Sequence, residues 1–511
     1  MSGQPHILVA AKNSQELTGT PEKGNPMSST RKGARAVRPG AALAVLAAAQ
    51  FAVALSTSIV NVALPAVRDG VGLSDTGMSW VVNSYGLAFG ALLLLGGRTA
   101  DLVGRRRVLL GGLALFTVAS VAAGLATGAW ALIAARTAQG VGAAAVAPAA
   151  LSLVMRLFPP GPGRAKAIGV WGAVSGAGGA AGVLLGGVLT EGLGWPWVFH
   201  VSGLGAAVVL VGTLLLVPAS PPDDGAAGRL DLVGTLTVTA GLVALVYGLT
   251  SAGRSGWTDP WVLGSLGTAA VLLALFLLVE RRHPAPLLPP RLWTEGLVAP
   301  ANLVMTLLGA VWVGLFFFLP LYQQQVLGAG PLETGLSQLP LAAANMLGSW
   351  FAPRLARRFG PHVTLAAGLL TQAAGLLWLS RITADGSYPT DLLGPILVIG
   401  LGLGTAFVQL TGAAVTGVRP ADSGLASGLV NTTRQIGGAV GLAVLGTLAA
   451  SRTAAAAHHH SPAAALTEGY RLAFLVSAAV VAVGAALTPL LSRRLAAQPR
   501  TEEAPAPAPT R

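Results

Sequence analysis

Fourteen long apolar stretches follow one another along the 511 residues of this chain. A helix needs about 20 apolar residues to cross the roughly 30 Å of hydrocarbon in a bilayer, and only helices or closed barrels satisfy every backbone polar group there. These stretches are too long and too uniformly apolar for barrel strands, so the sequence predicts an all-helical (all-α) polytopic membrane protein. The expected spans are residues 41–67, 78–97, 107–127, 129–153, 166–189, 197–217, 231–251, 260–280, 297–320, 333–352, 363–380, 389–413, 426–449 and 471–491.

The positive charges are distributed unevenly between the two sides of these spans. The formal net charge is +13, from 32 Lys and Arg against 19 Asp and Glu. An even number of spans places both termini on one side, which holds 25 of the basic residues, against five on the other side and two inside spans. Because basic residues concentrate in cytoplasmic loops, we expect a multi-pass protein of the cell membrane with both termini in the cytoplasm. The charge is then a topology signal and predicts no nucleic-acid partner.

Polar segments divide the chain into expected domains. Residues 1–40 and 492–511 are polar and rich in small residues and proline, and we expect disordered cytoplasmic tails rather than a cleaved signal. A basic segment after the second span, residues 98–104, has a weak echo at residues 354–360, which suggests two related halves. The expected domains are six-helix bundles at 41–218 and 297–491, joined by two inserted membrane helices at 231–281.

Two arginines stand inside apolar spans. Arg136 lies in the fourth span, and Gln139 and Gly140 share its helical face. A cation without water is costly in a bilayer, so this residue is expected to face protein and to mark a functional site. Arg434 lies near the cytoplasmic start of its span, where a long side chain can reach the interface. We expect it to be structural.

Several segments resemble signatures of the major facilitator superfamily, in particular of its fourteen-span drug:proton antiporters. These segments are residues 59–65, 97–107, 132–140, 178–187 and 322–328. The resemblance extends over about residues 41–491. It implies the major facilitator fold, with two six-helix bundles plus two extra linking helices. It also implies proton-driven export of drug-like or antibiotic compounds by alternating access.

The resemblance gives roles to the residues that match its signatures. The loop signature implies a conformational latch between the halves, formed by Gly97, Asp101, Gly104, Arg105 and Arg106. From the residues alone, the glycines allow a tight turn, the aspartate can pair with an arginine, and the basic run anchors the loop at the membrane. An orienting loop without a gating role is the alternative.

The fifth-span signature is rich in glycine. Its matching positions are Gly178, Gly182, Gly186 and Gly187. Small residues at this spacing leave a smooth groove for a neighbouring helix. Two overlapping explanations account for the glycines of this span: close packing of two helices, and a tightly closed helix interface that prevents leak through the transporter.

Two departures from the antiporter signatures affect proton coupling. These antiporters usually carry an Asp in the first helix where this chain has Ser56, and a Pro in the fifth helix where it has Val183. No Asp or Glu lies deep in any expected span. Arg136 therefore lacks an obvious counter-ion, and no proline kink is expected in the fifth helix.

Three hypotheses explain the missing acid. His200 can carry the proton, because imidazole titrates near neutral pH, although an interfacial structural role is its alternative. Arg136 can instead bind an anionic or carbonyl-bearing substrate directly. Its expected polar companions in a substrate and proton pathway are Ser56, Asn61 and Gln139. Finally, a carboxylate at the end of a span, such as Glu333, can face the cavity.

Motifs of other functional classes are missing from the chain. It has no Cys, which excludes disulfides and thiolate metal sites, and it lacks the P-loop, GxSxG and HExxH motifs. We expect no enzyme activity, no catalytic residue, no nucleotide, no metal and no cofactor. The expected partners are a small organic substrate, protons and the lipid bilayer. The alternative functions are uptake or facilitated transport of an anionic organic solute without proton antiport, and a membrane sensor that transports nothing.

Overall fold

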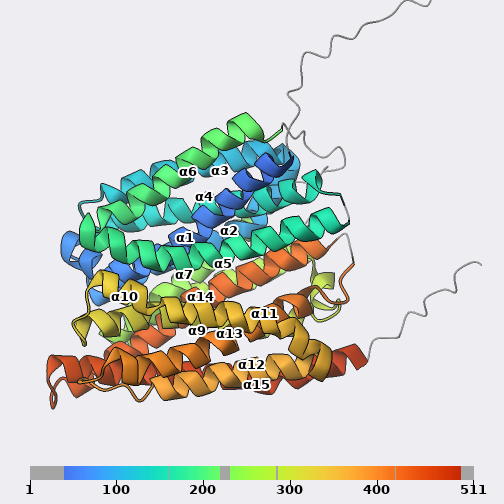
Figure 1. Ribbon diagram of the computed structural model, residues 1–511. Helices are drawn as coiled ribbons and strands as arrows, with labels where there is room; N and C mark the ends of the chain where they lie inside the picture. Colours follow the sequence, from blue (N-terminus) through green and yellow to red (C-terminus); the bar gives the residue numbers. More distant parts are fainter. Residues whose placement is uncertain (1–38, 160, 219–230, 284–285, 420–421, 497–511) are drawn as a thin grey trace, which may run out of the picture. The chain divides into compact units, whose positions relative to one another are not determined.

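The computed structural model describes residues 39–159, 161–218, 231–283, 286–419 and 422–496, and these form helices and connecting turns without a β-strand (Figure 1). The first six helices are α1 Pro39–Val71, α2 Asp75–Val103, α3 Arg105–Gly124, α4 Ala129–Leu157, α5 Pro162–Gly192 and α6 Pro196–Leu216. The next two are α7 Leu232–Ser255 and α8 Pro260–Arg282. The remainder are the short helix η1 Pro290–Trp293, α9 Val298–Gln325, α10 Pro331–Ser337, α11 Leu339–Phe359, α12 Pro361–Leu379, the π-turn η2 Tyr388–Leu392, α13 Leu393–Val415, α14 Ser423–Ala456 and α15 Pro462–Ala496.

The expected tails lie mostly outside the described residues. α1 already includes residues 39 and 40, and α15 continues through residue 496. The rest of both tails, and the linker at 219–230, are not among the residues that the structure describes.

Local signals in the sequence set the helix ends. The Asp231 carboxylate accepts a 2.7 Å hydrogen bond from the Gly234 amide at the start of α7, as an N-cap residue does. Asp259 caps α8 in the same way, directly before Pro260 in the first turn. Gly104 separates α2 from α3 with φ 108°, a conformation that favours glycine.

Thirteen of the described helices are long and apolar enough to cross a membrane. The exception is the tenth expected span, 333–352, which the structure divides into α10 and α11 at Gln338. Pro340 has no N–H to continue the α10 hydrogen-bond ladder, so the helix restarts there. The expectation of one continuous helix at 333–352 is therefore wrong, whereas the all-helical polytopic class is confirmed.

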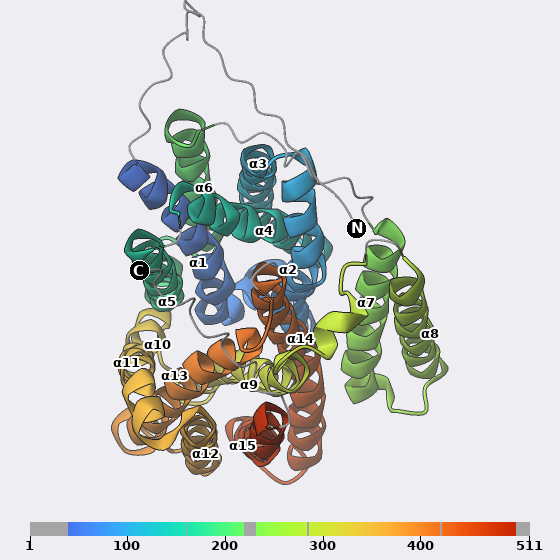
Figure 2. The ribbon, with the colours of Figure 1, turned by 90° about the vertical axis from the view of Figure 1, so that its right-hand side faces the viewer.

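The helices form two groups with a hairpin beside them. In the first group α1 packs on α5 and α6, and α4 packs on α2 and α3. In the second, α9 packs on α14 and α15, and α13 packs on α11 and α12. The hairpin of α7 and α8 lies against α2 and α14, on one side of the bundle in the end-on view (Figure 2). This is the expected arrangement of two six-helix bundles and two linking helices.

The two groups meet along α2 and α14 and again where α5 meets α10. We call the end of the bundle where α1 begins the proximal end, and the opposite end the distal end. A Cβ on Gly187 of α5 would lie 2.5 Å from the Pro331 carbonyl oxygen of α10, and the Glu191 carboxylate accepts a 2.9 Å hydrogen bond from the Leu332 amide. In the proximal half of α5, Gly172 and Gly176 have no neighbouring atom within 4 Å of a Cβ position. The second group thus contacts α5 closely at its distal end.

Candidate functional site

Arg136 lies seven residues into α4 and is 1% exposed. Its Nε donates to the Val81 carbonyl oxygen at 3.1 Å, and its Nη1 donates to the Gln139 side-chain oxygen at 2.8 Å and to the Ser56 hydroxyl at 3.4 Å. The side chain therefore faces protein, as expected for a cation in a membrane span. Its hydrogen-bond acceptors are neutral groups from α1, α2 and α4.

Two further side chains complete this arrangement. The Gln139 amide donates to the Ser120 hydroxyl on α3 at 2.6 Å, and that hydroxyl donates to the Phe116 carbonyl oxygen at 2.7 Å. The Arg136 guanidinium carbon lies 4.4 Å from the centre of the Tyr85 ring. Hydrogen bonds and a cation–π contact stabilise the charge where no water can.

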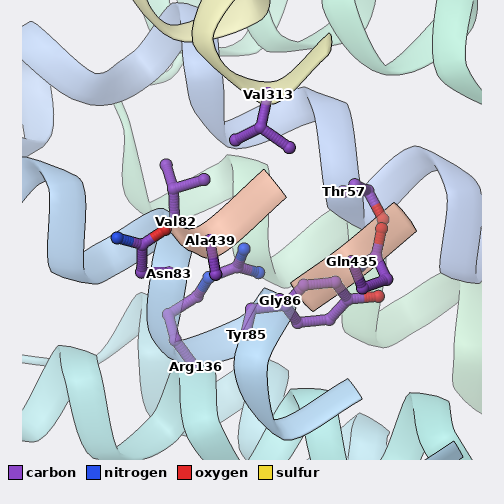
Figure 3. Close-up of a pocket in the computed structure, with 9 residues that line it drawn as sticks. All are labelled: Thr57, Val82, Asn83, Tyr85, Gly86, Arg136, Val313, Gln435 and Ala439. Atoms are coloured by element: carbon purple, nitrogen blue, oxygen red, sulfur yellow. The ribbon is translucent and has the colours of Figure 1, made fainter. Parts of the chain in front are cut away.

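A small cavity lies beside Arg136, between the two helix groups. Its volume is about 30 Å³, roughly that of one water molecule. Figure 3 shows its lining, which comes from α1, α2, α4, α9 and α14: Thr57, Val82, Asn83, Tyr85, Gly86, Arg136, Val313, Gln435 and Ala439. Asn83 is 1% exposed, and neither of its side-chain polar atoms has a hydrogen-bond partner among the described residues. The cavity holds unused hydrogen-bonding capacity but must widen to admit an organic molecule.

Two of the sequence-predicted residues, Asn61 and His200, lie apart from the contacts of Arg136. Asn61 is buried, and its side-chain oxygen has no partner among the described residues. The His200 ring packs edge-on to Trp197, 5.8 Å between ring centres, and lies against Gly124 at the distal end of α3. A role for His200 or Asn61 in the pathway stays a prediction.

Four of the predicted latch residues, Gly97, Asp101, Arg105 and Arg106, make contacts within the first helix group. Arg105 donates to the Asp101 carboxylate at 3.2 Å, and Arg106 donates to the Leu214 carbonyl oxygen of α6 at 2.9 Å. A Cβ on Gly97 would meet Pro148 of α4 at 3.6 Å. These contacts tie the α2–α3 turn to its own group, and the latch to the second group stays a prediction.

The glycines of α5 pack directly against the backbone of α1. A Cβ on Gly178, Gly182 or Gly186 would lie under 3.0 Å from the carbonyl oxygen of Phe51, Leu55 and Ile59 respectively. These positions recur every four residues on both helices, so one face of α5 lies along one face of α1. Gly187 instead faces α10. Val183 leaves α5 unbroken, as expected from the absence of proline there.

Sequence reasoning named Ser56 of α1 as a companion of Arg136 but missed the other side chains that neighbouring helices supply. Tyr85 and Asn83 are polar or aromatic residues in the middle of an apolar span, which was an available signal, whereas Ser120 gave none. Arg434 lies deeper than expected, because α14 begins at Ser423. The eleven residue steps from Ser423 to Arg434 place it about 16 Å from that end.

Membrane-crossing helices in two groups, with a buried polar site where the groups meet, are the architecture of secondary transporters. The sequence pattern of the Major Facilitator Superfamily matches residues 46–442. The chain belongs to this superfamily of membrane transporters, and it is not an enzyme.

Relatives in this superfamily are named for antibiotic resistance and export. The chain is 42% identical to the puromycin resistance protein pur8 of Streptomyces alboniger, over 87% of this chain and 90% of that protein. It is 41% identical to the cephamycin export protein CmcT of Amycolatopsis lactamdurans, over 88% of this chain and 92% of that protein. It is 35% identical to the lincomycin resistance protein of Streptomyces lincolnensis, over 90% of this chain and 93% of that protein.

Solved structures show the same fold. An inward-facing, unoccupied bacterial homolog of the human lysosomal transporter Spinster matches with a TM-score of 0.64 at 17% identity, over 89% of this chain and 97% of that one. An auto-inhibited peptide transporter of the POT family matches with a TM-score of 0.65 at 16% identity, over 91% and 99%. At these identities the likeness concerns the fold alone.

Proposed function

We propose that the protein exports small, largely apolar organic compounds, of the drug or antibiotic kind, by alternating access driven by the proton gradient. One observation carries the proposal: the cavity at Arg136 is lined by both helix groups. A site lined in this way opens to either side when the groups rock about it. The names of the relatives, which include resistance and export of puromycin, cephamycin and lincomycin, support an organic substrate and the outward direction.

The contacts between α5 and α10 fit one end state of such a cycle. Gly187, Glu191 and Leu332 join the groups at the distal end, and the Gln324 amide of α9 adds a 2.9 Å hydrogen bond to the Val62 carbonyl oxygen of α1. In the proposal these contacts close the outer side and break when substrate is released. The basic residues at the proximal end support placing that end in the cytoplasm of a cell membrane.

Proton coupling in this proposal needs a group other than a first-helix acid. Ser56 occupies that place and accepts from Arg136 at 3.4 Å. The candidates are His200, the fifth residue of α6, and Glu333, in the first turn of α10, both at the distal end. Arg136, Gln139, Ser56 and Asn61 form the proposed substrate side of the pathway.

Export is tested by efflux from cells loaded with puromycin, lincomycin or a cephamycin. We expect cells that make the protein to lose the compound faster than cells that lack it, and a proton uncoupler to abolish the difference. Efflux that continues with the uncoupler contradicts proton antiport.

The coupling group is tested by comparing His200→Gln with Ser56→Asp. A shifted pH profile of efflux in the His200 variant supports this residue as the carrier. An unaltered profile removes it and leaves Glu333→Gln as the next variant to measure.

A second function is favoured by one observation. Among the described residues, no carboxylate forms an ion pair with Arg136. The site therefore also suits transport of an anionic organic solute without proton antiport. Uptake of an organic anion that ignores the uncoupler is the result that distinguishes this function from export.

A further inference from the structure

A second arginine lies inside a membrane-crossing helix, on the opposite helix group from Arg136. Arg434 is about 16 Å from the proximal end of α14, and Arg136 is about 10 Å from the distal end of α4, at 1.5 Å per residue. Both helices are long and apolar enough to cross a membrane. Both cations therefore stand within membrane-crossing helices rather than at their ends.

Contacts of Arg434 connect it with the cavity at Arg136. Its guanidinium carbon lies 5.8 Å from the centre of the Trp312 ring, and the next residue on each helix, Val313 and Gln435, lines the cavity. Tyr85, whose ring centre lies 4.4 Å from the Arg136 guanidinium carbon, lines the same cavity and interacts electrostatically with both arginines. Arg136 thus lies in the wall of the cavity, and Arg434 lies on a helix that lines it.

Arg434 has unused hydrogen-bonding capacity. Its Nε is fully buried and has no acceptor among the described residues. Its Nη2 makes one long hydrogen bond, 3.4 Å, to the Asn431 side-chain oxygen. By contrast with Arg136, which has three acceptors, this guanidinium can still receive a ligand.

Neither cation is balanced by an acid. The ion pairs among the described residues lie near the ends of helices, and none includes Arg136 or Arg434. Two positive charges in a medium of low dielectric constant attract an anion strongly. A carboxylate also matches the planar donor pair of a guanidinium.

We propose that Arg434 is a substrate-binding residue which, with Arg136 and Asn83, takes the carboxylate of an organic anion. This proposal rests on the proposed transport function and specifies its substrate class. The carboxylate binds at Arg434 and is attracted by the charge of Arg136, while the apolar part of the compound occupies the widened cavity. Asn83, whose amide has no partner in the described part of the chain, supplies a neutral donor to the same group.

The binding test uses a matched pair of probes, naphthalene-2-carboxylate and naphthalene-2-carboxamide, which differ in charge but hardly in size. We expect calorimetric titration of the full chain in nanodiscs to give a lower Kd for the carboxylate. Arg434→Gln should weaken carboxylate binding roughly 10- to 100-fold, the range for hydrogen bonds to a charged group, and leave the amide within about twofold. Arg434→Lys should retain part of the preference, because it keeps the charge. Arg381→Gln, which removes an exposed arginine after α12, is the control and should match the wild type.

Several results would overturn the proposal. They are equal affinity of the wild type for both probes, no carboxylate binding at all, binding of chloride alone, and equal loss of both probes in a folded Arg434→Gln. Equal affinity of the wild type overturns the proposal without any variant. Where Arg434→Gln does not fold, Arg434→Lys tests the residue, because an unchanged carboxylate preference and affinity in that variant contradicts a role for the guanidinium.

Transport of the same probes separates this proposal from the proposed function. If proteoliposomes transport the carboxylate and amide alike, and Arg434→Gln changes neither rate, the role of Arg434 fails while export stands. If the wild type transports no compound of any panel but binds the carboxylate through Arg434, export fails while the anion site stands.

Discussion

Arg136 is stabilised in the membrane by neutral groups rather than by an acid. Its guanidinium donates to three oxygens, from Val81, Gln139 and Ser56, and stacks on Tyr85. The three acceptors belong to three helices, so the planar fork of the guanidinium joins α1, α2 and α4. A point charge alone does not reproduce this geometry.

We expect Arg136→Lys to lose transport by roughly tenfold or more, because an ammonium cannot reach the acceptors of the guanidinium fork. Arg136→Ala should abolish transport. Initial rates in proteoliposomes measure both, and circular dichroism verifies that the variants remain helical. Normal transport by a folded Arg136→Ala contradicts the role of this residue.

Ser120 supports Arg136 through Gln139. Ser120→Ala removes the acceptor of the Gln139 amide, which is fully buried, and an unsatisfied buried donor costs about 1–3 kcal/mol. We expect a lower Tm in detergent. Ser202→Ala is the matched control, because the Ser202 hydroxyl is buried too but bonds only the Val198 carbonyl oxygen of its own helix. An equal Tm change in both variants argues against the supporting role.

At this scale the sequence predicted contacts within a helix better than contacts between helices. The spacing of Arg136 and Gln139 placed them on one face, and the structure joins them at 2.8 Å. Ser120 and Tyr85 come from helices whose positions depend on packing, so the spacing carries no information about them. Helical spacing also carries no information about the distance between His200 and Arg136, which lie on different helices. In the structure His200 lies apart from the contacts of Arg136.

Among the elements, α5 has two different glycine faces. Gly178, Gly182 and Gly186 lie against α1, whereas Gly172 and Gly176 have no atom within 4 Å of a Cβ position. Only the first face requires glycine for close approach. Helical spacing predicts a groove but does not by itself show which glycines line it, because Gly172 and Gly176 are four residues apart as well.

We predict that Gly182→Val disrupts the α1–α5 contact and abolishes transport, since its Cβ would lie 2.8 Å from the Leu55 carbonyl oxygen. Gly172→Ala should keep transport and raise stability by up to about 1 kcal/mol through helix propensity. Thermal unfolding and transport rates of the two variants test this. Equal tolerance of both substitutions contradicts the packing described for α5.

Hydropathy failed to predict that residues 333–352 are divided between two helices, α10 and α11. Residues 333–352 are apolar enough to suggest one span, but Pro340 interrupts the hydrogen-bond ladder at Gln338. The short first piece, α10, is the part that contacts α5. A proline inside an apolar run was the available signal for this break.

In the whole molecule, the distal contacts between the two helix groups are the part that the proposed alternating-access cycle requires to change. The chain has no Cys, so an introduced pair reports on these contacts without background. We expect Glu191→Cys with Leu332→Cys to form a disulfide that stops transport, and a reductant to restore it. Each single variant should remain active. Full transport by the oxidised pair would mean that the distal end need not open.

The class of the molecule was predictable because the spans, the charge asymmetry and the intramembrane arginine depend on the chemistry of the bilayer rather than on packing. The contacts between the two helix groups were not predictable from the sequence. Asn83 and Gln435, on either side of the cavity at Arg136, come from α2 and α14, which are far apart in the sequence. Only the folded chain brings them together.

Proton movement driven by substrate tests the central claim most directly. Proteoliposomes containing the wild type, with a pH-sensitive dye inside, are given puromycin, lincomycin or a cephamycin under an imposed pH gradient. Proton-coupled export at Arg136 predicts that at least one compound accelerates collapse of the gradient, and that Arg136→Ala shows no acceleration. An unchanged rate with every compound that the wild type transports, or an equal acceleration in Arg136→Ala, contradicts the account.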